Sequence, residues 1–173
     1  MNARIVRMAG LLTLLMAVPL AGCGDSGVGD EERRASAVEA ARRYTQASLD
    51  RRWKEVCESV TERLRKGTVA ECIEMRDLPR VGDYMDARVA MGKPFDMEAD
   101  GPYRAGVGVR ATMHLDPATG NRIDTALRLI LDGDDGWLID QAANMDASLG
   151  TGPEVARARL EEVAETTGPA AAQ

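Results

Sequence analysis

The sequence predicts an α+β domain in which helices pack on one face of an antiparallel sheet. Three observations predict this class. Apolar side chains recur at helical spacing over residues 31–66, they alternate with polar ones over residues 87–141, and turn-forming residues separate the alternating segments. Helices followed by strands indicate an antiparallel sheet with segregated helices rather than an alternating α/β arrangement.

Two amphipathic helices are expected first. Residues 31–50 contain no glycine or proline and are dominated by alanine and arginine, which are good helix formers. A sharper apolar stripe runs along residues 51–66, and Gly67 suits the C-terminal end of that helix. The two stripes consist of Ala35, Val38, Ala41, Thr45 and Leu49, and of Trp53, Val56, Cys57, Val60 and Leu64.

A short third helix is expected after Thr68. Thr68 and Glu71 have the spacing of a capping box, in which each side chain hydrogen-bonds the backbone of the other residue. Val69, Cys72 and Ile73 form its apolar face. Leu78-Pro79 ends helical growth, because the residue before a proline disfavours the helical conformation.

Alternating segments then predict a meandering sheet with one apolar and one polar face. The expected strands are residues 87–91, 95–98, 103–115 and 123–131, with a last strand beginning over 137–141. The turns between them are rich in Gly, Pro, Asp and Asn. On the clearest strand, Val107 and Val109 lie on the apolar face, whereas Arg104, Arg110 and His114 lie on the face expected to point away from the helices.

The C-terminal residues are expected to be a tail. Gly150 to Pro153 ends the domain, which we place at residues 31–149, and proline is favoured at the first position of a helix. Residues 154–165 have good helix formers but only a thin apolar stripe of Ala156, Leu160 and Val163, so they are either a solvated helix or a frayed tail. Residues 168–173 are expected to be disordered.

The N-terminus has the layout of a secretory signal peptide. Arg4 and Arg7 precede the uncharged residues 8–21, and small residues then lead to Cys23. An uncleaved transmembrane helix is the alternative, but 14 uncharged residues interrupted by Pro19 fall short of the roughly 20 that span a bilayer.

Leu20-Ala21-Gly22-Cys23 resembles the lipobox of bacterial lipoproteins at every position. The resemblance implies a signal peptide of residues 1–22, diacylglycerol on the Cys23 sulfur, acylation of the new amine (palmitate), and a location on the extracytoplasmic face of the cell membrane. Two or three acyl chains anchor a protein stably. Residues 23–30, rich in Gly and Asp, are then expected to be a flexible tether between lipid and domain.

The charge of the expected mature protein restricts its partners. Residues 23–173 hold 28 acidic and 20 basic residues, a formal net charge of −8. This charge argues against nucleic acid and against a polybasic contact with anionic lipid, which leaves the lipid on Cys23 as the expected link to the membrane. The preference for arginine over lysine is typical of a GC-rich genome, such as that of an actinobacterium.

Cys57 and Cys72 are expected to form a disulfide, because they are an even pair in a chain expected in an oxidising compartment. Its loop of about 15 residues would stabilise the fold by roughly 3 kcal/mol in the chain-entropy model. A zinc site would need more ligands than two cysteines and one distant histidine, and redox pairs usually have two residues between the cysteines.

The order of elements resembles the NTF2-like, or cystatin-like, fold, in which a long helix and shorter helices precede a strongly curved sheet. Cys57 and Cys72 match a cysteine pair that exported actinobacterial members carry between the second and third helices, and Gly136 to Ile139 resembles the family's last strand. The resemblance implies a pocket between helices and sheet. Family enzymes place an Asp/His or Tyr/Asp pair inside this pocket.

Few residues are candidates for chemistry. His114, the one histidine, is expected on the polar face as a solvated strand residue. Asp124 could lie opposite it across a hairpin, as a general base would need, but an exposed salt bridge explains that pairing as well. Tyr44, Trp53 and Trp137 are either the mouth of a pocket or large core residues. The sequence predicts no catalytic, cofactor or metal residues, since residues 132–135 lack the alternating ligands of a calcium loop and Gly106-x-Gly108 precedes no helix.

We therefore expect a membrane-anchored lipoprotein whose domain binds a small apolar ligand or an envelope protein without catalysis. The alternative is an NTF2-like pocket enzyme, of isomerase or dehydratase type, with an ionisable group buried in a deep cavity. Dimerisation through the open sheet face is disfavoured by Arg104, Arg110 and Arg128 on that face.

Overall fold

A computed structural model describes residues 26–77, 86–116, 118–133, 136–146 and 148–167. The expected signal peptide, Cys23, Leu78-Pro79 and the tail from residue 168 lie outside these residues. The helices are α1 (Ser26–Leu49), α2 (Trp53–Glu58), α3 (Glu62–Arg65), α4 (Val69–Arg76) and α5 (Pro153–Thr167). The strands are β1 (Arg88–Met91), β2 (Phe95–Met97), β3 (Gly106–Asp116), β4 (Asn121–Leu131) and β5 (Trp137–Met145).

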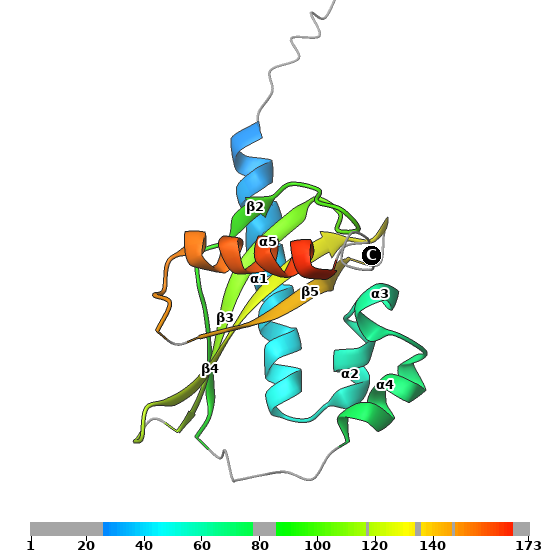
Figure 1. Cartoon of the computed structure of the whole chain (residues 1–173), viewed down its shortest axis with the longest axis vertical. Coiled ribbons are helices and arrows are strands. Elements are labelled where there is room, and N and C mark those ends of the chain that lie inside the picture. Colours follow the sequence, from blue (N-terminus) through cyan, green and yellow to red (C-terminus); the bar gives the residue numbers. More distant parts are fainter. Residues whose placement is uncertain (1–25, 78–85, 117, 134–135, 147, 168–173) are drawn as a thin grey trace, which may run out of the picture.

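The α+β class is confirmed: the helices α1–α4 precede a curved, open antiparallel sheet (Figure 1). The sheet order is β1-β3-β4-β5, and β2 pairs with the same edge of β3 as β1 does, closer to the start of β3. α1 begins at Ser26, five residues before the expected helix and inside the predicted tether. No helix in the described part of the chain is long and apolar enough to cross a membrane.

The expected second helix is wrong in one respect, because it is two helices. α2 ends at Glu58 and Thr61 caps α3, its side chain accepting a hydrogen bond from the Leu64 N–H. The residues between them pair with the sheet instead of continuing the helix. The Thr61 N–H donates to the Ile139 carbonyl over 2.9 Å, and the Ile139 N–H donates to the Ser59 carbonyl over 2.8 Å.

The predicted disulfide and capping box are both present. Cys57 of α2 and Cys72 of α4 are bonded, with 6.0 Å between their Cα atoms, and both are buried. The Thr68 side chain accepts from the Glu71 N–H, and the Glu71 carboxylate accepts from the Thr68 N–H over 2.7 Å. The disulfide therefore fastens the short α4 onto α2.

Helices cover both faces of the sheet, which corrects the expectation that one face points to solvent. α1 lies behind the sheet and α5 crosses its front in Figure 1. The α1 face carries the expected apolar residues, which pack against α1, among them Val109, Ala111, Leu127, Leu129 and Ile139. On the α5 face, Ala126, Ala143 and Phe95 pack against Ala156 and Leu160.

α5 is neither a solvated helix nor a frayed tail. Ala156 and Leu160 are completely buried, Ala164 is 4% exposed and Val163 is partly buried, so the thin stripe packs against the sheet. The domain therefore continues past residue 149, to Thr167 at least.

Candidate functional site

A groove between α1, α2 and the start of β5 brings two of the three predicted pocket residues together. Tyr44 of α1 and Trp137 of β5 both line it, and its volume is about 380 Å³. Small residues and Leu138 complete its apolar wall, whereas charged side chains stand at its rim. The remaining lining residues are Ala40, Ala47, Leu138, Ser59, Arg43, Arg52, Glu55 and Glu58.

Tyr44 and Trp137 are held by the core as well as exposed to the groove. Both are half-buried and pack against the apolar cluster on the α1 face. The Trp137 indole Nε1 donates a hydrogen bond to the Ser36 hydroxyl of α1 over 2.9 Å. Tyr44 and Trp137 therefore pack against the core and also line the groove.

Trp53 is not part of this groove. It is the first residue of α2, is half-buried, and has the Arg51 guanidinium 5.7 Å from its ring centroid. Its buried indole nitrogen has no hydrogen-bond partner among the described residues. The structure therefore separates Trp53 from Tyr44 and Trp137.

His114 does not lie opposite Asp124, as the sequence suggested. Its cross-strand neighbours are Arg88 on β1 and Arg122 on β4, whereas Asp124 lies opposite Thr112. The predicted register was two residues off, so the paired carboxylate that a general base needs is not supplied by Asp124.

Asp124 instead pairs with the buried Arg110. Its Oδ1 atom accepts from Arg110 Nη2 at 2.8 Å and from the Thr112 hydroxyl at 2.5 Å, and Arg122 Nε lies 3.1 Å from Oδ2. Burial by itself raises the pKa of Asp124, but the hydrogen bonds from Thr112 and Arg110 outweigh it and lower the pKa below its usual value. Since Arg110 Nη1 also donates to the Gly150 carbonyl over 2.9 Å, this ion pair joins the sheet to the loop before α5.

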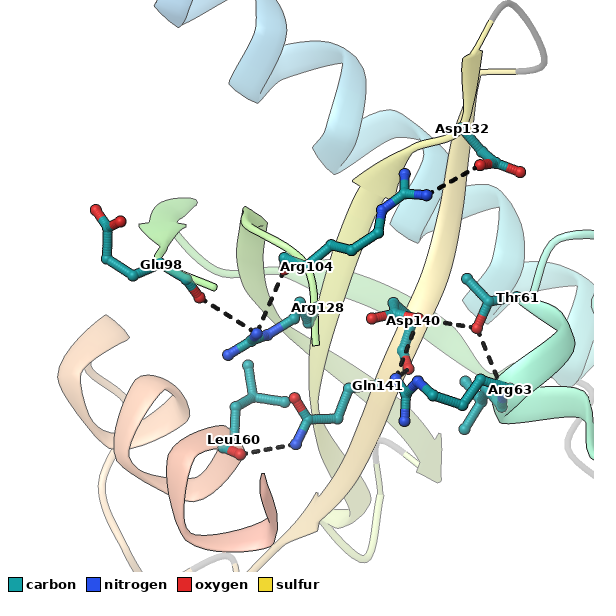
Figure 2. A network of polar contacts seen from close by, with 10 residues as sticks. Thr61, Arg63, Glu98, Arg104, Arg128, Asp132, Asp140, Gln141 and Leu160 are labelled. Atoms are coloured by element: carbon teal, nitrogen blue, oxygen red, sulfur yellow. Dashed lines mark hydrogen bonds and ion pairs between the residues drawn. The ribbon is translucent and has the colours of Figure 1, made fainter. Parts of the chain in front are cut away.

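A second buried arginine, Arg128 of β4, lies beneath α5 without such a partner (Figure 2). Its side chain is completely buried, and Nη1 reaches the carbonyls of Glu98 and Arg104 over 3.3 and 3.4 Å. Nε and Nη2 have no hydrogen-bond partner among the described residues. Burial lowers the pKa of Arg128, and the carboxylates of Asp100 and Asp140 only partly oppose this effect.

Gln141 lies directly across the strand pair from Arg128. It is 2% exposed, and its amide nitrogen donates to the Leu160 carbonyl of α5 over 2.7 Å. That bond fixes the orientation of the amide, because the reversed amide would place two oxygens together. The Gln141 Oε1 atom has no partner among the described residues.

Asp140 is placed beside this pair by an irregularity in β5. Arg128 pairs with Gln141 and Leu129 pairs with Ile139, so Asp140 is the extra residue of a β-bulge. Its Oδ1 atom accepts from the Thr61 hydroxyl at 2.9 Å and from Arg63 Nη2 at 3.1 Å. The contacts to Asp140 in Figure 2 therefore come from the N-cap residue Thr61 and from Arg63 of α3.

A tyrosine ring connects these groups. The Arg63 guanidinium lies 4.0 Å from the centroid of the Tyr103 ring, and the Arg128 guanidinium lies 5.2 Å from it. Cation–π contacts favour a guanidinium in this position without supplying hydrogen-bond acceptors. We define the buried polar cluster as Arg128, Gln141, Asp140 and Tyr103, with the exposed Arg63 at its margin.

Sequence reasoning missed the buried polar cluster, because a charged residue on an alternating strand was assigned to solvent. Two features of the sequence could have indicated that this face is buried. Ala126 and Ile130 flank Arg128 on the same face of β4, and α5 carries an apolar stripe that includes Leu160. No group of metal-ligating residues occurs in the described ranges. Comparisons with protein-family models, with curated proteins and with solved structures find no match for this chain.

Proposed function

We propose that this chain is a membrane-anchored extracytoplasmic lipoprotein that binds a small, largely apolar ligand in the groove lined by Tyr44 and Trp137. The observation that carries the ligand site is the convergence of these two aromatic side chains, from α1 and β5, on one groove. The lipobox-like Leu20-Ala21-Gly22-Cys23 carries the anchor.

The groove has the dimensions of a small-molecule site and two aromatic residues in its lining. Its volume of about 380 Å³ is within the range of roughly 300–1,000 Å³ of such pockets. Aromatic rings provide large apolar contact area with little loss of side-chain freedom. The charged residues that line the groove are two arginines and two glutamates, and Arg52 is paired with Glu55, so they favour a ligand with a polar end rather than one of a particular charge.

A small ligand is favoured over an envelope protein, because the apolar part of the site is a groove between secondary structure elements. A pocket enzyme is less well supported. It requires an ionisable group buried between the helices and the sheet, whereas the charged residues that line the groove are exposed. The buried arginines and Asp124 belong to the α5 face or to its margin.

Binding is tested with 1-anilinonaphthalene-8-sulfonate, whose aromatic body matches the aromatic residues of the groove and whose sulfonate supplies a polar end. Tyr44→Ala should weaken binding of this probe by about tenfold or more, as expected from the loss of one aromatic contact of roughly 1.5 kcal/mol. Trp53→Ala is the matched control and should retain the affinity. Equal affinities in wild type, Y44A and W137A, with folding verified by circular dichroism, would contradict the proposed site.

The anchor is tested separately by Cys23→Ser in the full-length chain. The wild-type protein should fractionate with membranes and carry the mass of its acyl chains, whereas C23S should lack that mass. An unmodified Cys23 in membrane-associated wild-type protein would refute the anchor while leaving the groove untouched.

A further inference from the structure

Arg128 is a completely buried charge that the described contacts satisfy only in part. A buried charge is tolerated when it is paired and hydrogen-bonded, and an uncompensated one costs several kcal/mol. Arg128 is completely buried, yet two of its three nitrogens have no partner among the described residues. Arginine does not lose its proton at accessible pH, so neutralisation is no escape.

The two unpartnered nitrogens are a matched pair. In a guanidinium, the Nε–H and one Nη2–H point in parallel along the same edge, and this edge fits the two oxygens of a carboxylate or phosphate. The third nitrogen, Nη1, is occupied by the Glu98 and Arg104 carbonyls. Those contacts, together with the Tyr103 ring, hold the guanidinium so that its binding edge remains available.

An unused acceptor stands next to this unused donor edge. Gln141 is the direct cross-strand neighbour of Arg128, and its Oε1 is fixed away from α5 by the bond from its amide nitrogen to Leu160. Cross-strand neighbours have Cβ atoms about 4.5–5.5 Å apart, close enough for both side chains to contact one small molecule. Asp140, the adjacent bulge residue, is held by Thr61 and Arg63 and is not one of the proposed contacts, because a carboxylate repels an anion.

We infer that Arg128 and Gln141 form an internal site for a small oxyanion that also carries a hydroxyl group, such as hydrogen phosphate or bicarbonate. Two oxygens of the anion accept from Arg128 Nε and Nη2, and its O–H donates to Gln141 Oε1. A fully deprotonated anion would leave Gln141 Oε1 facing an oxygen, which is why the class is restricted to hydroxyl-bearing oxyanions. This site lies beneath α5 and is distinct from the groove lined by Tyr44 and Trp137.

The test measures the melting temperature of the full-length protein against rising concentrations of phosphate, bicarbonate, acetate and chloride at constant ionic strength. A ligand that binds the folded state raises the melting temperature with the logarithm of its concentration above the dissociation constant. Wild type should respond to phosphate or bicarbonate more strongly than to acetate, which has no O–H, and least to chloride. An unresponsive wild type, or one that responds equally to all four salts, would overturn the site.

Variants locate the response. Arg128→Met should abolish it, and Arg128→Lys, which keeps the charge but loses the parallel donors, should weaken phosphate binding by about 10- to 100-fold. R128K also serves as the readout if R128M does not fold. The matched control is Arg104→Met, which removes a neighbouring arginine that is 55% exposed and should leave the response intact.

Gln141→Met separates the hydroxyl contact from the charge contact. It should weaken phosphate and bicarbonate while leaving the weaker acetate response unchanged. A phosphate response that is the same in wild type and R128M would refute the proposal, and an equal loss for phosphate and acetate in Q141M would refute its hydroxyl part.

Discussion

Arg110 and Arg128 lie on the same face of one sheet, and they differ in how their charge is compensated. Arg110 is bonded through all three nitrogens, to Asp124 and to the Gly150 carbonyl. Arg128 is more deeply buried and has only long contacts to two carbonyls. The comparison teaches that burial of a charge alone does not reveal its role: Arg110 is satisfied as part of the structure, whereas Arg128 is held ready for a partner from outside the described chain.

The largest effect is expected when the Arg110 pair is broken. Asp124→Asn removes the negative charge and leaves Arg110 buried and uncompensated, which should lower the free energy of unfolding by about 3–5 kcal/mol. Urea unfolding of the variant measures this loss. A loss below about 1 kcal/mol would show that the pair is no more valuable than an exposed one and would remove the contrast with Arg128.

The next effect concerns the helix that covers Arg128. Leu160 is completely buried and packs against the cluster of Phe95, Ala126 and Ala143, so Leu160→Ala should cost about 2–5 kcal/mol. Arg159→Ala, on the same helix but half-exposed, is the control. Hydrogen exchange should show faster exchange of β4 amides beneath α5 in L160A, and unchanged exchange there would mean that α5 does not protect Arg128.

Replacing Arg128 should change the free energy of unfolding only slightly, and any change should be a gain in stability. In a buffer without phosphate or carbonate, Arg128→Met should leave the free energy of unfolding within about 1 kcal/mol of wild type or raise it, because an uncompensated buried charge is replaced by an apolar chain. The same urea titration measures it. If R128M lost as much free energy of unfolding as D124N, Arg128 would be a structural residue like Arg110.

The smallest effect is expected at an exposed counterpart of these pairs. Asp96 Oδ1 of β2 lies 2.6 Å from Arg33 Nη2, and Asp96 also pairs with Arg34. The hydrogen bond from Arg34 is the main cause that lowers the pKa of Asp96, and Arg33 adds to it. A lowered folded-state pKa stabilises above the unfolded value of about 3.9, and this stabilisation disappears as pH falls through the folded pKa. The Asp96 carboxylate is 43% exposed, so screening limits the effect.

Melting temperatures of wild type and Asp96→Asn should therefore differ slightly at pH 7, begin to converge below about pH 4, and become equal only below the lowered pKa of Asp96. Added salt should reduce the difference at pH 7. A difference that grows on acidification would mean that Asp96 acts through something other than its charge.

Most of the fold could be predicted because it follows from periodicity. The apolar face of β3 and β4 and the capping box at Thr68 are local patterns. The disulfide was predicted because Cys57 and Cys72 are the two cysteines left once Cys23 is assigned to the lipobox-like motif. The break between α2 and α3 could not be predicted this way. Residues 59–61 match the helical stripe, but their backbone groups find partners on Ile139, which is remote in the sequence.

The candidate site was predictable only in its apolar half. Tyr44 and Trp137 are conspicuous as large aromatic residues in a chain with 3% aromatic content, and both line the groove. The buried polar cluster depends on α5 folding back over the sheet, and its short apolar stripe did not indicate that docking. Once α5 covers the sheet, alternation no longer separates buried from exposed residues.

The pairing of residues 59–61 with Ile139 also affects how this chain meets other chains. β5 is the last strand of the sheet order, and an uncovered edge strand is a template for aggregation. The bridge between Val60 and Ile139 occupies part of that edge with the protein's own backbone. Because Cys57 is three residues before Val60, the bond to Cys72 fastens the segment that covers this edge, and we expect reduction to promote aggregation as well as to lower stability.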